Sequence, residues 1–324
     1  MAQPGSALFL MNADGTLQSD VDRAAVERAH ASGESFWLDV RTPGEDEFRM
    51  LSEVFGFHQL ALEDSRMFGQ RPKLDSYDGF AFMVVYGASP DEDGLVESHV
   101  FYNGTYLVSV HHDVAPAFQR LREAAGRHHR PFERPSVLLY RIVDAMTESF
   151  YPLLNDFDER IDALEDRTFA SPDDTVLQEI FRLKRRLVGV RKVVTAQRDL
   201  FGSVSAGSED LPGVTAEDER YFRDVYDHLI RISDLLDTYR DLLSSAMDVY
   251  LSSVSNRLNA VMKQLAMIAT VFLPLSFIVG FFGQNFAYMV RNVTSARDFW
   301  LYGIGTEVVA ILALLYLFRR RRWI

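Results

Sequence analysis

The chain of 324 residues has a formal net charge of −12 and contains no cysteine. The length suffices for one sizeable soluble domain together with a membrane part. The negative charge argues against a nucleic-acid partner and favours attraction of cations, and the lack of cysteine excludes disulfides and thiolate zinc sites.

Residues 1–135 are predicted to form a mixed α/β domain in the cytoplasm. Apolar alternation and short apolar runs predict strands at residues 6–11, 35–40, 81–85, 96–102 and 105–111. Helical spacing of apolar residues predicts helices at residues 20–32, 44–55, 58–67 and 115–129. Ser19 or Asp20 is expected to cap the first of these helices. Asn103 and Gly104 separate the last two strands and favour a hairpin turn.

The strand patterns end near residue 135, and helical patterns follow. The charged segment 136–169 predicts one long helix. A cap within residues 171–173 starts another helix, which runs to about Phe201. The segment up to residue 213 is rich in glycine, serine and acidic residues and predicts a flexible connection. Residues 136–213 are therefore expected to form long cytoplasmic helices and a linker.

The next segment changes from a polar to an apolar composition while it stays helical. No glycine or proline occurs between Gly213 and Pro274, so one helix of roughly 60 residues and about 90 Å is predicted. Residues 214–264 form its acidic cytoplasmic stalk. Residues 265–285 are nearly all apolar and form the first predicted transmembrane helix, with a short signature at its end.

A second apolar run covers residues 299–318 and contains one charged residue, Glu307. The tail at residues 319–324 begins with four arginines, which hold this end of the span in the cytoplasm. No signal peptide is visible at the N-terminus. With a short outer loop at residues 286–298, both termini are expected in the cytoplasm and both spans in the inner or plasma membrane.

One side of the long helix carries a polar stripe that repeats every seven residues. The stripe has carboxylates in the aqueous half and small or weakly polar residues in the membrane half. Its members are Asp227, Asp234, Asp241, Asp248, Ser255, Met262, Ala269, Ser276 and Gly283, with a companion register of Asn259, Ala266, Leu273 and Gly280. Such a stripe suits helices arranged around an open axis that attracts cations. A solvated helix face remains the alternative. In a straight helix, positions that repeat every seven residues rotate around the axis by about 20° per heptad, so this stripe could spread over a wide face.

Gly283, Gln284 and Asn285 follow the first predicted span directly. The chain resembles the CorA-type divalent metal ion transporters, which carry Gly-Met-Asn at this place. Further blocks that look like family sequence are residues 70–73, 221–228, 248–256 and 268–274 and the basic tail. The resemblance implies an α+β cytoplasmic domain, a very long stalk helix and two transmembrane helices in a CorA-like pentameric funnel. The expected partners are then further copies of the chain, the lipid bilayer and divalent cations.

In that arrangement the first span lines the pore, and Gly283, Gln284 and Asn285 form the selectivity filter. Glycine exposes backbone carbonyls, and the asparagine oxygen can accept hydrogen bonds from the waters that Mg²⁺ releases reluctantly. A simple helix C-cap is the alternative interpretation of this triplet. The expected pore-lining residues are Asp248, Asn259, Met262, Leu265, Ala266, Leu273 and Ser276. The larger apolar side chains among them would form a constriction that gates by excluding water, although Leu265 could equally serve helix packing.

The chain departs from the family pattern at two places. Gln284 replaces the signature methionine, and the outer loop contains Arg291 where magnesium-transporting members usually have an acidic Met-Pro-Glu-Leu run. Zinc-transporting relatives of the ZntB kind are similarly variable at the middle signature position and lack that acidic loop. The family resemblance makes Mg²⁺ and Co²⁺ the leading substrates, and these two departures make Zn²⁺ the alternative.

Asp224 resembles a family residue that binds a regulatory divalent ion together with an acidic residue of the neighbouring subunit. By alignment that partner is Asp91 or Asp93, in the loop at residues 89–94. Carboxylates are the expected ligands of hard cations. The alternative is an ordinary solvated acidic loop and helix face.

Nothing in the sequence supports catalysis, because it contains no phosphate-binding glycine loop, nucleophile elbow or His-Glu-x-x-His motif. No cofactor is expected apart from a divalent cation as substrate and regulator. A membrane-anchored metal sensor without transport is the rival interpretation from another class. The first histidine pair, at residues 111–112, is not expected to chelate one ion, since neighbouring residues on a strand point to opposite faces. The histidines of this pair and of the pair at residues 128–129 are interpreted as surface residues.

Overall fold

The computed structural model describes residues 6–89, 94–112, 115–128, 134–170, 173–209, 211–284, 287–292 and 295–321. The chain forms two compact units, Met1–Asp248 and Val249–Ile324. Helix α8 (Glu219–Phe282) contributes residues to both units.

Seven strands of the described residues form one mixed sheet in the first unit, in the order β2-β1-β3-β7-β6-β5-β4. The strands are β1 (Ala7–Asn12), β2 (Leu17–Ser19), β3 (Phe36–Arg41), β4 (Lys73–Tyr77), β5 (Phe80–Ala88), β6 (Leu95–Tyr102) and β7 (Leu107–His111). The central strands β3 and β7 are parallel, and the other neighbouring pairs are antiparallel. Every residue of β5 and of β7 is buried, so both faces of the sheet are covered. The sequence patterns do not predict the edge strands β2 and β4.

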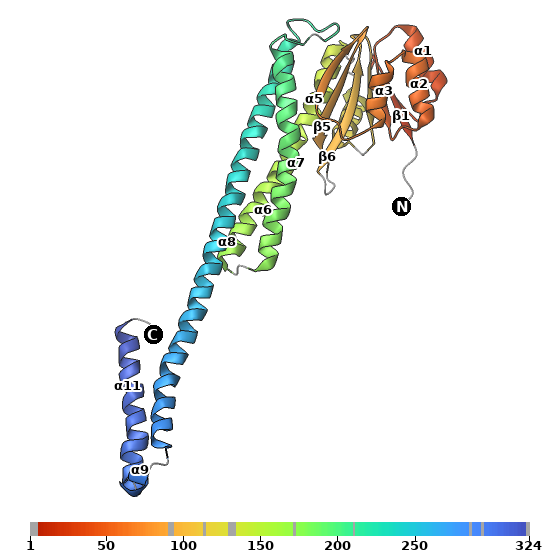
Figure 1. Ribbon diagram of the computed structural model, residues 1–324. Helices are drawn as coiled ribbons and strands as arrows, with labels where there is room; N and C mark the ends of the chain where they lie inside the picture. The colour runs from red at the N-terminus through yellow and green to blue at the C-terminus, as the bar shows by residue number, and fades with distance from the viewer. Residues whose placement is uncertain are drawn as a thin grey trace. The chain divides into compact units, whose positions relative to one another are not determined.

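Helices lie on both sides of this sheet (Figure 1). The helices of this unit are α1 (Arg23–Ser32), α2 (Glu45–Phe55), α3 (Gln59–Arg66), α4 (Pro116–His128), α5 (Pro135–Glu148), α6 (Phe150–Ala170), α7 (Asp174–Ser205) and the first part of α8. Helices α1, α2 and α3 cover one side, and α5 and α7 contact β5 from the other. Fully buried residues of α8 recur every three or four positions, from Phe222 and Val225 through Leu229 and Ile232 to Leu236, as expected for an amphipathic helix.

Two local signals in the sequence show how these elements begin and turn. The carboxylate of Asp22 caps α1 by accepting the Ala25 N–H at 2.8 Å, so the cap predicted at Ser19 or Asp20 is wrong. The hairpin predicted at Asn103 is confirmed between β6 and β7. The Asn103 side-chain oxygen accepts the N–H groups of Thr105 and Tyr106 at 2.9 and 2.8 Å.

The single helix predicted over residues 136–169 is wrong in one respect, because Ser149 divides it into α5 and α6. The Ser149 hydroxyl donates to the Met146 carbonyl at 2.5 Å and accepts the N–H of Ala88 in β5 at 2.6 Å. A Cβ atom at Gly87 would lie 2.8 Å from that hydroxyl oxygen. The close approach of β5 to this turn therefore accounts for the division.

A buried polar network joins β3 to β7, and it corrects the assignment of His111 to the surface. His111 and Asp39 are each 1% exposed, and His111 Nε2 lies 3.0 Å from Asp39 Oδ1. Ser109 donates to the same oxygen at 2.6 Å, and Arg122 forms an ion pair with Asp39 Oδ2. Burial acts to raise the pKa of Asp39, but the neighbouring His111, Arg122 and Ser109 outweigh it and hold this pKa below its usual value. His112 is exposed, as predicted, and His129 lies outside the described residues.

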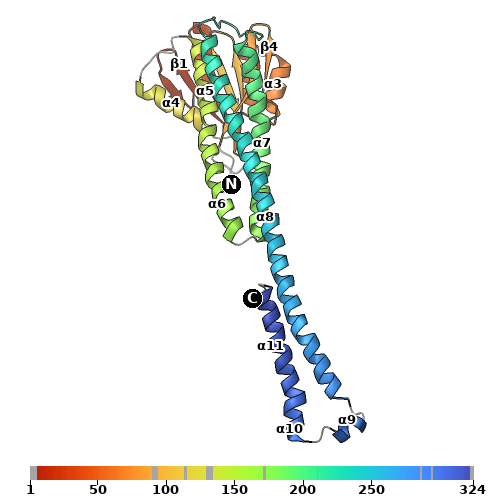
Figure 2. The ribbon, with the colours of Figure 1, turned by 90° about the vertical axis from the view of Figure 1, so that its left-hand side faces the viewer.

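The second unit contains the remainder of α8, the short helices α9 (Ala287–Asn292) and α10 (Ala296–Asp298), a π-helical turn η1 (Phe299–Ile304) and α11 (Gly305–Arg320). Two helical segments, Glu219–Phe282 and Ala296–Arg320, are long and apolar enough to cross a membrane. Within this unit, α11 lies beside the C-terminal part of α8 in both views (Figures 1 and 2).

Candidate functional site

The predicted pore-lining residues lie on α8, and all of them are exposed in the single chain. They are Asp248, Asn259, Met262, Leu265, Ala266, Leu273 and Ser276. The apolar members are exposed to a large degree, for example Leu273 at 71% and Met262 at 61%. Large apolar side chains with this exposure need a lipid or protein partner.

Another face of the same helix is half-buried. Its residues are Met267, Thr270, Val271, Pro274, Leu275 and Ile278, whose spacing of one and three places them on one side of α8. The neighbouring α11 has a half-buried row of its own, formed by Glu307, Ala310, Ile311 and Leu314. None of the predicted pore-lining residues belongs to this half-buried face. They therefore remain available to other copies of the chain.

The signature triplet, which starts at Gly283, begins directly after the end of α8. Phe282 is the last helical residue, the Gly283 N–H donates to the Val279 carbonyl at 2.9 Å, and the Gln284 N–H donates to the Phe281 carbonyl at 3.3 Å. A Cβ atom at Gly283 would lie 3.1 Å from the Val279 oxygen, which is a tight contact and favours glycine. Asn285 lies outside the described residues.

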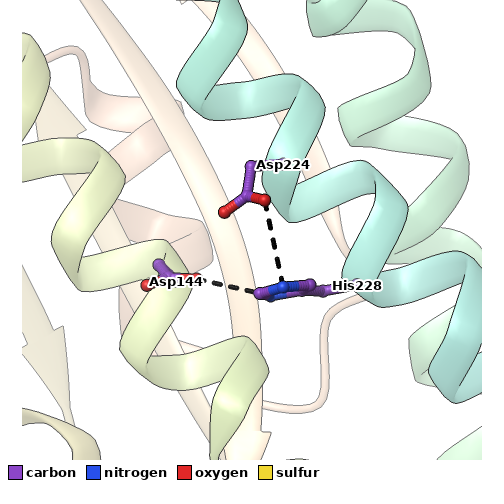
Figure 3. A group of neighbouring side chains, drawn as sticks. All are labelled: Asp144, Asp224 and His228. Carbon is purple, nitrogen blue, oxygen red and sulfur yellow. Dashed lines mark ion pairs between the residues drawn. The ribbon is translucent and has the colours of Figure 1, made fainter.

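The structure places Asp224 in a group of three side chains in the first unit. Asp224 and His228 are one turn apart on α8, and Asp144 faces them from α5 (Figure 3). His228 Nδ1 lies 3.6 Å from Asp144 Oδ1, and His228 Nε2 lies 3.9 Å from Asp224 Oδ1. One ligand atom from each residue lies within 4.8 Å of the other two, which is compact enough for all three to reach one metal ion.

Two atoms of this three-residue cluster lack hydrogen bonds. Asp144 Oδ1 and His228 Nδ1 are buried, and neither has a hydrogen-bond partner among the described residues. Buried polar atoms normally have a partner, and leaving one unsatisfied costs free energy. A bound cation would satisfy the carboxylate oxygen and the neutral imidazole nitrogen together.

The electrostatics of the cluster also favour a cation. Burial and the Glu148 and Asp224 carboxylates raise the pKa of Asp144 to about 6, although His228 opposes this. The hydroxyl of Tyr140 lies 3.3 Å from Asp224 Oδ2, and burial and the carboxylates of Asp144 and Asp224 raise the tyrosine pKa as well. The three neighbouring acids Asp144, Glu148 and Asp224 repel one another, and a divalent cation would relieve this repulsion.

The site predicted from the sequence overlaps this cluster at one residue, Asp224. The predicted partners Asp91 and Asp93 lie outside the described residues, so their pairing with Asp224 stays a prediction. Asp144 and His228 are the residues that the sequence reasoning missed. His228 carries a local signal, since it follows Asp224 by four positions on a helix. Asp144 has Glu148 four positions after it on α5, but nothing in the sequence shows that α5 lies beside this part of α8.

The comparisons with known proteins define the class as metal ion transporters and not enzymes. Residues 32–320 match the family described as CorA-like Mg2+ transporter protein. The cobalt/magnesium transport protein CorA of Thermotoga maritima is 34% identical over 289 residues, which is 86% of this chain and 80% of the relative. The chain belongs to the CorA family.

Solved structures agree with this assignment. The complete CorA magnesium transporter of Methanocaldococcus jannaschii has a TM-score of 0.85 and 27% sequence identity, and the match covers 100% of both chains. This confirms the predicted soluble α/β domain, long helix and two apolar helices. The ZntB cytoplasmic domain of Vibrio parahaemolyticus has a TM-score of 0.63 over 78% of this chain and all of its own. At 12% identity it shows a shared fold alone.

Proposed function

We propose that the chain is one subunit of a homo-oligomeric channel that carries divalent cations passively, with Mg²⁺ and Co²⁺ as the leading substrates. The observation that carries this proposal is the free face of α8, on which all seven predicted pore-lining side chains are exposed. Two spans of one chain cannot enclose a water-filled path. A ring of copies, expected to be a pentamer, would turn this face toward a common axis and keep Asn259 and Ser276 away from lipid.

The four arginines that end the second span support an orientation with the soluble unit and both termini in the cytoplasm. The proposed pathway then runs from Asp248 at the aqueous end to Gly283, Gln284 and Asn285 at the outer end. The neutral oxygens of this triplet can hold the water shell of an ion without binding the ion tightly.

The cluster of Asp144, Asp224 and His228 is the proposed regulatory cation site on the cytoplasmic side. Carboxylates suit Mg²⁺, and imidazole suits Co²⁺, Ni²⁺ and Zn²⁺ better than Mg²⁺. In a ring of copies, Asp224 would also face Asp91 or Asp93 of the neighbouring subunit, so metal bound at Asp224 would cancel the repulsion between subunits and stabilise the closed state. A fall in intracellular metal would restore that repulsion and favour opening.

A zinc channel is the second candidate, and one observation favours it. Gln284 stands where magnesium-type members carry methionine, and its amide group donates hydrogen bonds as well as accepting them. A lining of this kind is less uniformly electronegative. Arg291 in the outer loop would further weaken the attraction of cations to the mouth.

Uptake into liposomes tests the proposal and separates the two candidates. The reconstituted protein is given Mg²⁺, Co²⁺, Ni²⁺ and Zn²⁺ in parallel, and entry is followed with an enclosed metal indicator. The Asn285→Ala variant is expected to lose flux, and the control Asn155→Ala, at an exposed position of α6, is expected to keep it. No uptake of any of these ions by the intact oligomer would contradict the proposal and favour a sensor without transport.

A further inference from the structure

One cavity of the first unit has a lining that the proposed transport does not use. Its volume is about 360 Å³, which lies within the range of small-molecule sites. The end of β5, the start of α4, the first half of α6 and the middle of α7 contribute to its wall. Among the described residues that line it, none belongs to α8 and none to the cluster of Asp144, Asp224 and His228. Cation conduction and the proposed regulatory site therefore do not account for this cavity.

The lining of the cavity carries an excess of positive charge. Arg120, Arg160 and Arg186 contribute three positive charges and Asp156 contributes one negative charge, so the described lining has an excess of two. Burial acts to raise the pKa of Asp156, but hydrogen bonds from Arg160 and Arg186 outweigh it and hold this pKa below its usual value. In a chain with a net charge of −12, a concave site of positive charge is unexpected and suits an anionic ligand.

The acids near the cavity do not remove this excess. Glu179 Oε1 lies 3.8 Å from Arg160 Nη1, and Glu179 Oε2 lies 3.9 Å from Arg182 Nη1, so two arginines share this carboxylate. Counting Glu179 fully against the lining still leaves an excess of one positive charge. The acids at residues 91–93 lie outside the described residues and are not part of this balance.

Arg186 is held in place by its own chain but keeps unused hydrogen-bond donors. Its Nη1 donates to Asp156 Oδ2 at 2.7 Å, and its guanidinium carbon lies 5.3 Å from the centre of the Phe157 ring. Its Nε is buried beside Gly94 and has no hydrogen-bond partner among the described residues. A guanidinium group has five N–H donors, so most of those of Arg186 are left without an acceptor from the described chain. An anion in the cavity would supply acceptors to its Nη groups.

Arg120 approaches the cavity from a different element, α4. Its side chain is exposed, and it forms no hydrogen bond or ion pair with the described residues. Because no carboxylate of the described chain holds it, Arg120 can bind an incoming anion without first breaking an ion pair. The cavity thus has one fixed guanidinium group, on α7, and one that is free to close on a ligand.

Another part of the wall is apolar and preformed. Ala88, Pro116, Pro152 and Leu153 contribute to it. The Ser149 hydroxyl accepts the Ala88 N–H at 2.6 Å, which fixes the end of β5 against the turn before α6. A small ligand therefore meets charged donors on one part of the wall and an apolar surface on another, as in many small-molecule sites.

We propose that this cavity binds a phosphate group, with Arg120 and Arg186 as its main ligands. Planar guanidinium groups bind two phosphate oxygens at once, and a phosphate group carries about two negative charges at neutral pH, which suits the excess charge of the lining. The ligand is inorganic phosphate or a small phosphate ester, whose organic part the apolar wall accommodates. Bound phosphate would link α4 to α7 and stabilise the first unit. This site does not depend on the proposed transport.

Chemical modification of arginine tests the site directly. The intact oligomer, in a mild detergent without divalent cations, is treated with phenylglyoxal in sodium phosphate or in sodium chloride of equal ionic strength, and the adducts are located by mass spectrometry. Phosphate at about ten times its Kd should lower the adduct on Arg120 about tenfold. Arg185, which is exposed next to Arg186 on α7 but does not line the cavity, should be modified equally in both salts.

Isothermal titration of the same oligomer with phosphate tests the two ligands. Arg120→Gln should weaken binding about tenfold or more, because it removes a charged donor. This variant should fold normally, since Arg120 has no partner among the described residues. Arg186→Lys should also weaken binding, because an ammonium group cannot hold two oxygens side by side. The control Arg185→Gln should bind phosphate as wild type does.

Glycerol phosphate, titrated in parallel, separates the two sources of the phosphate group. Tighter binding than that of inorganic phosphate identifies an ester as the ligand, and the reverse order identifies free phosphate. Absence of phosphate binding, or equal protection of Arg120 by chloride, would overturn the proposal. Equal affinity of wild type, Arg120→Gln and Arg186→Lys would overturn it as well, because phosphate would then bind elsewhere.

Discussion

Gln197 of α7 hydrogen-bonds both backbone groups of Tyr86 in β5. Its side-chain oxygen accepts the Tyr86 N–H at 2.7 Å, and its amide donates to the Tyr86 carbonyl at 3.2 Å. The edge strand β4 pairs with β5 only as far as Val84. The glutamine therefore replaces a missing strand partner at a fully buried position, which ties the helical layer to the sheet.

Gln197→Ala is expected to destabilise the protein, because it leaves two buried backbone groups unsatisfied at about 1–3 kcal/mol each. Thermal or urea unfolding of the purified oligomer measures this loss. The control Gln178→Ala replaces an exposed glutamine of the same helix and should change stability little. Equal stability of the two variants would contradict the role assigned to Gln197.

Asp144 makes the stability of the first unit depend on pH. Its pKa of about 6 exceeds its ordinary value of 3.8, so between these pH values the folded protein holds a proton that the unfolded chain has released. The free energy of unfolding due to this group therefore falls by about 1–3 kcal/mol as pH rises through this window and is constant above it. Asp144→Asn should remove this part of the dependence.

The measurement is thermal unfolding without metal at about pH 4.5 and about pH 7, in wild type and variant. Glu159→Gln provides the control at an exposed acid. The same pH dependence in wild type and Asp144→Asn would show that Asp144 does not titrate as described.

Changes at Asp224 should alter the response to metal. Asp224→Lys places an ammonium group beside Asp144 and should keep the protein closed without metal, whereas Asp224→Ala should only reduce metal sensitivity. Each pair of like charges at roughly 4 Å is worth about 1–4 kcal/mol, and several pairs in a ring can shift an equilibrium of a few kcal/mol. Protease protection of α8, with and without millimolar Mg²⁺, measures this response.

For wild type, protection by metal should weaken as pH falls through about 6, because protons then compete for Asp144. Protection of wild type that does not depend on metal would count against a regulatory site at Asp224.

Gln284→Met is expected to raise Mg²⁺ uptake relative to Zn²⁺ uptake. The substitution removes an amide that donates hydrogen bonds and leaves the backbone oxygens to define the lining. Parallel liposome uptake of the two ions gives the ratio. If the ratio stays the same while Arg291→Glu changes it, the outer loop determines ion choice instead.

The intact complex should contain five chains. Mass measurement in a mild detergent decides this, since the proposed pore needs several copies of the exposed face of α8. A stable monomer or dimer that still transports cations would refute the proposed ring.

The sequence predicts elements well where the signal is local. The periodicity of α8 and the turn at Asn103 depend on neighbouring residues, and both predictions are confirmed. The strand β4 is not predicted because Lys73–Tyr77 is short and mostly polar. Its pairing with β5 is what makes it a strand. The break at Ser149 is not predicted for a related reason, because it depends on a hydrogen bond with Ala88, which is 61 residues away in the sequence.

In the candidate site, too, residues with a local signal can be predicted and residues brought in by the tertiary fold cannot. Asp224 is found through its place in a family block, and His228 could be found from its helical spacing. Asp144 approaches them from another helix, 80 residues before Asp224 in the chain, so only the tertiary fold brings it to the cluster. The burial of His111 likewise depends on Asp39, 72 residues before it.

The parallel pairing of β3 with β7 has a consequence for synthesis on the ribosome. Asp39 in β3 and Ser109 in β7 are 70 residues apart, and translation adds about 5–20 residues per second, so this pairing waits for about 4–14 seconds. During that interval the apolar β3 has β1 on one edge and no strand on the other. The nascent chain therefore exposes an aggregation-prone edge until β7 emerges, and this is the period in which a chaperone protects it best.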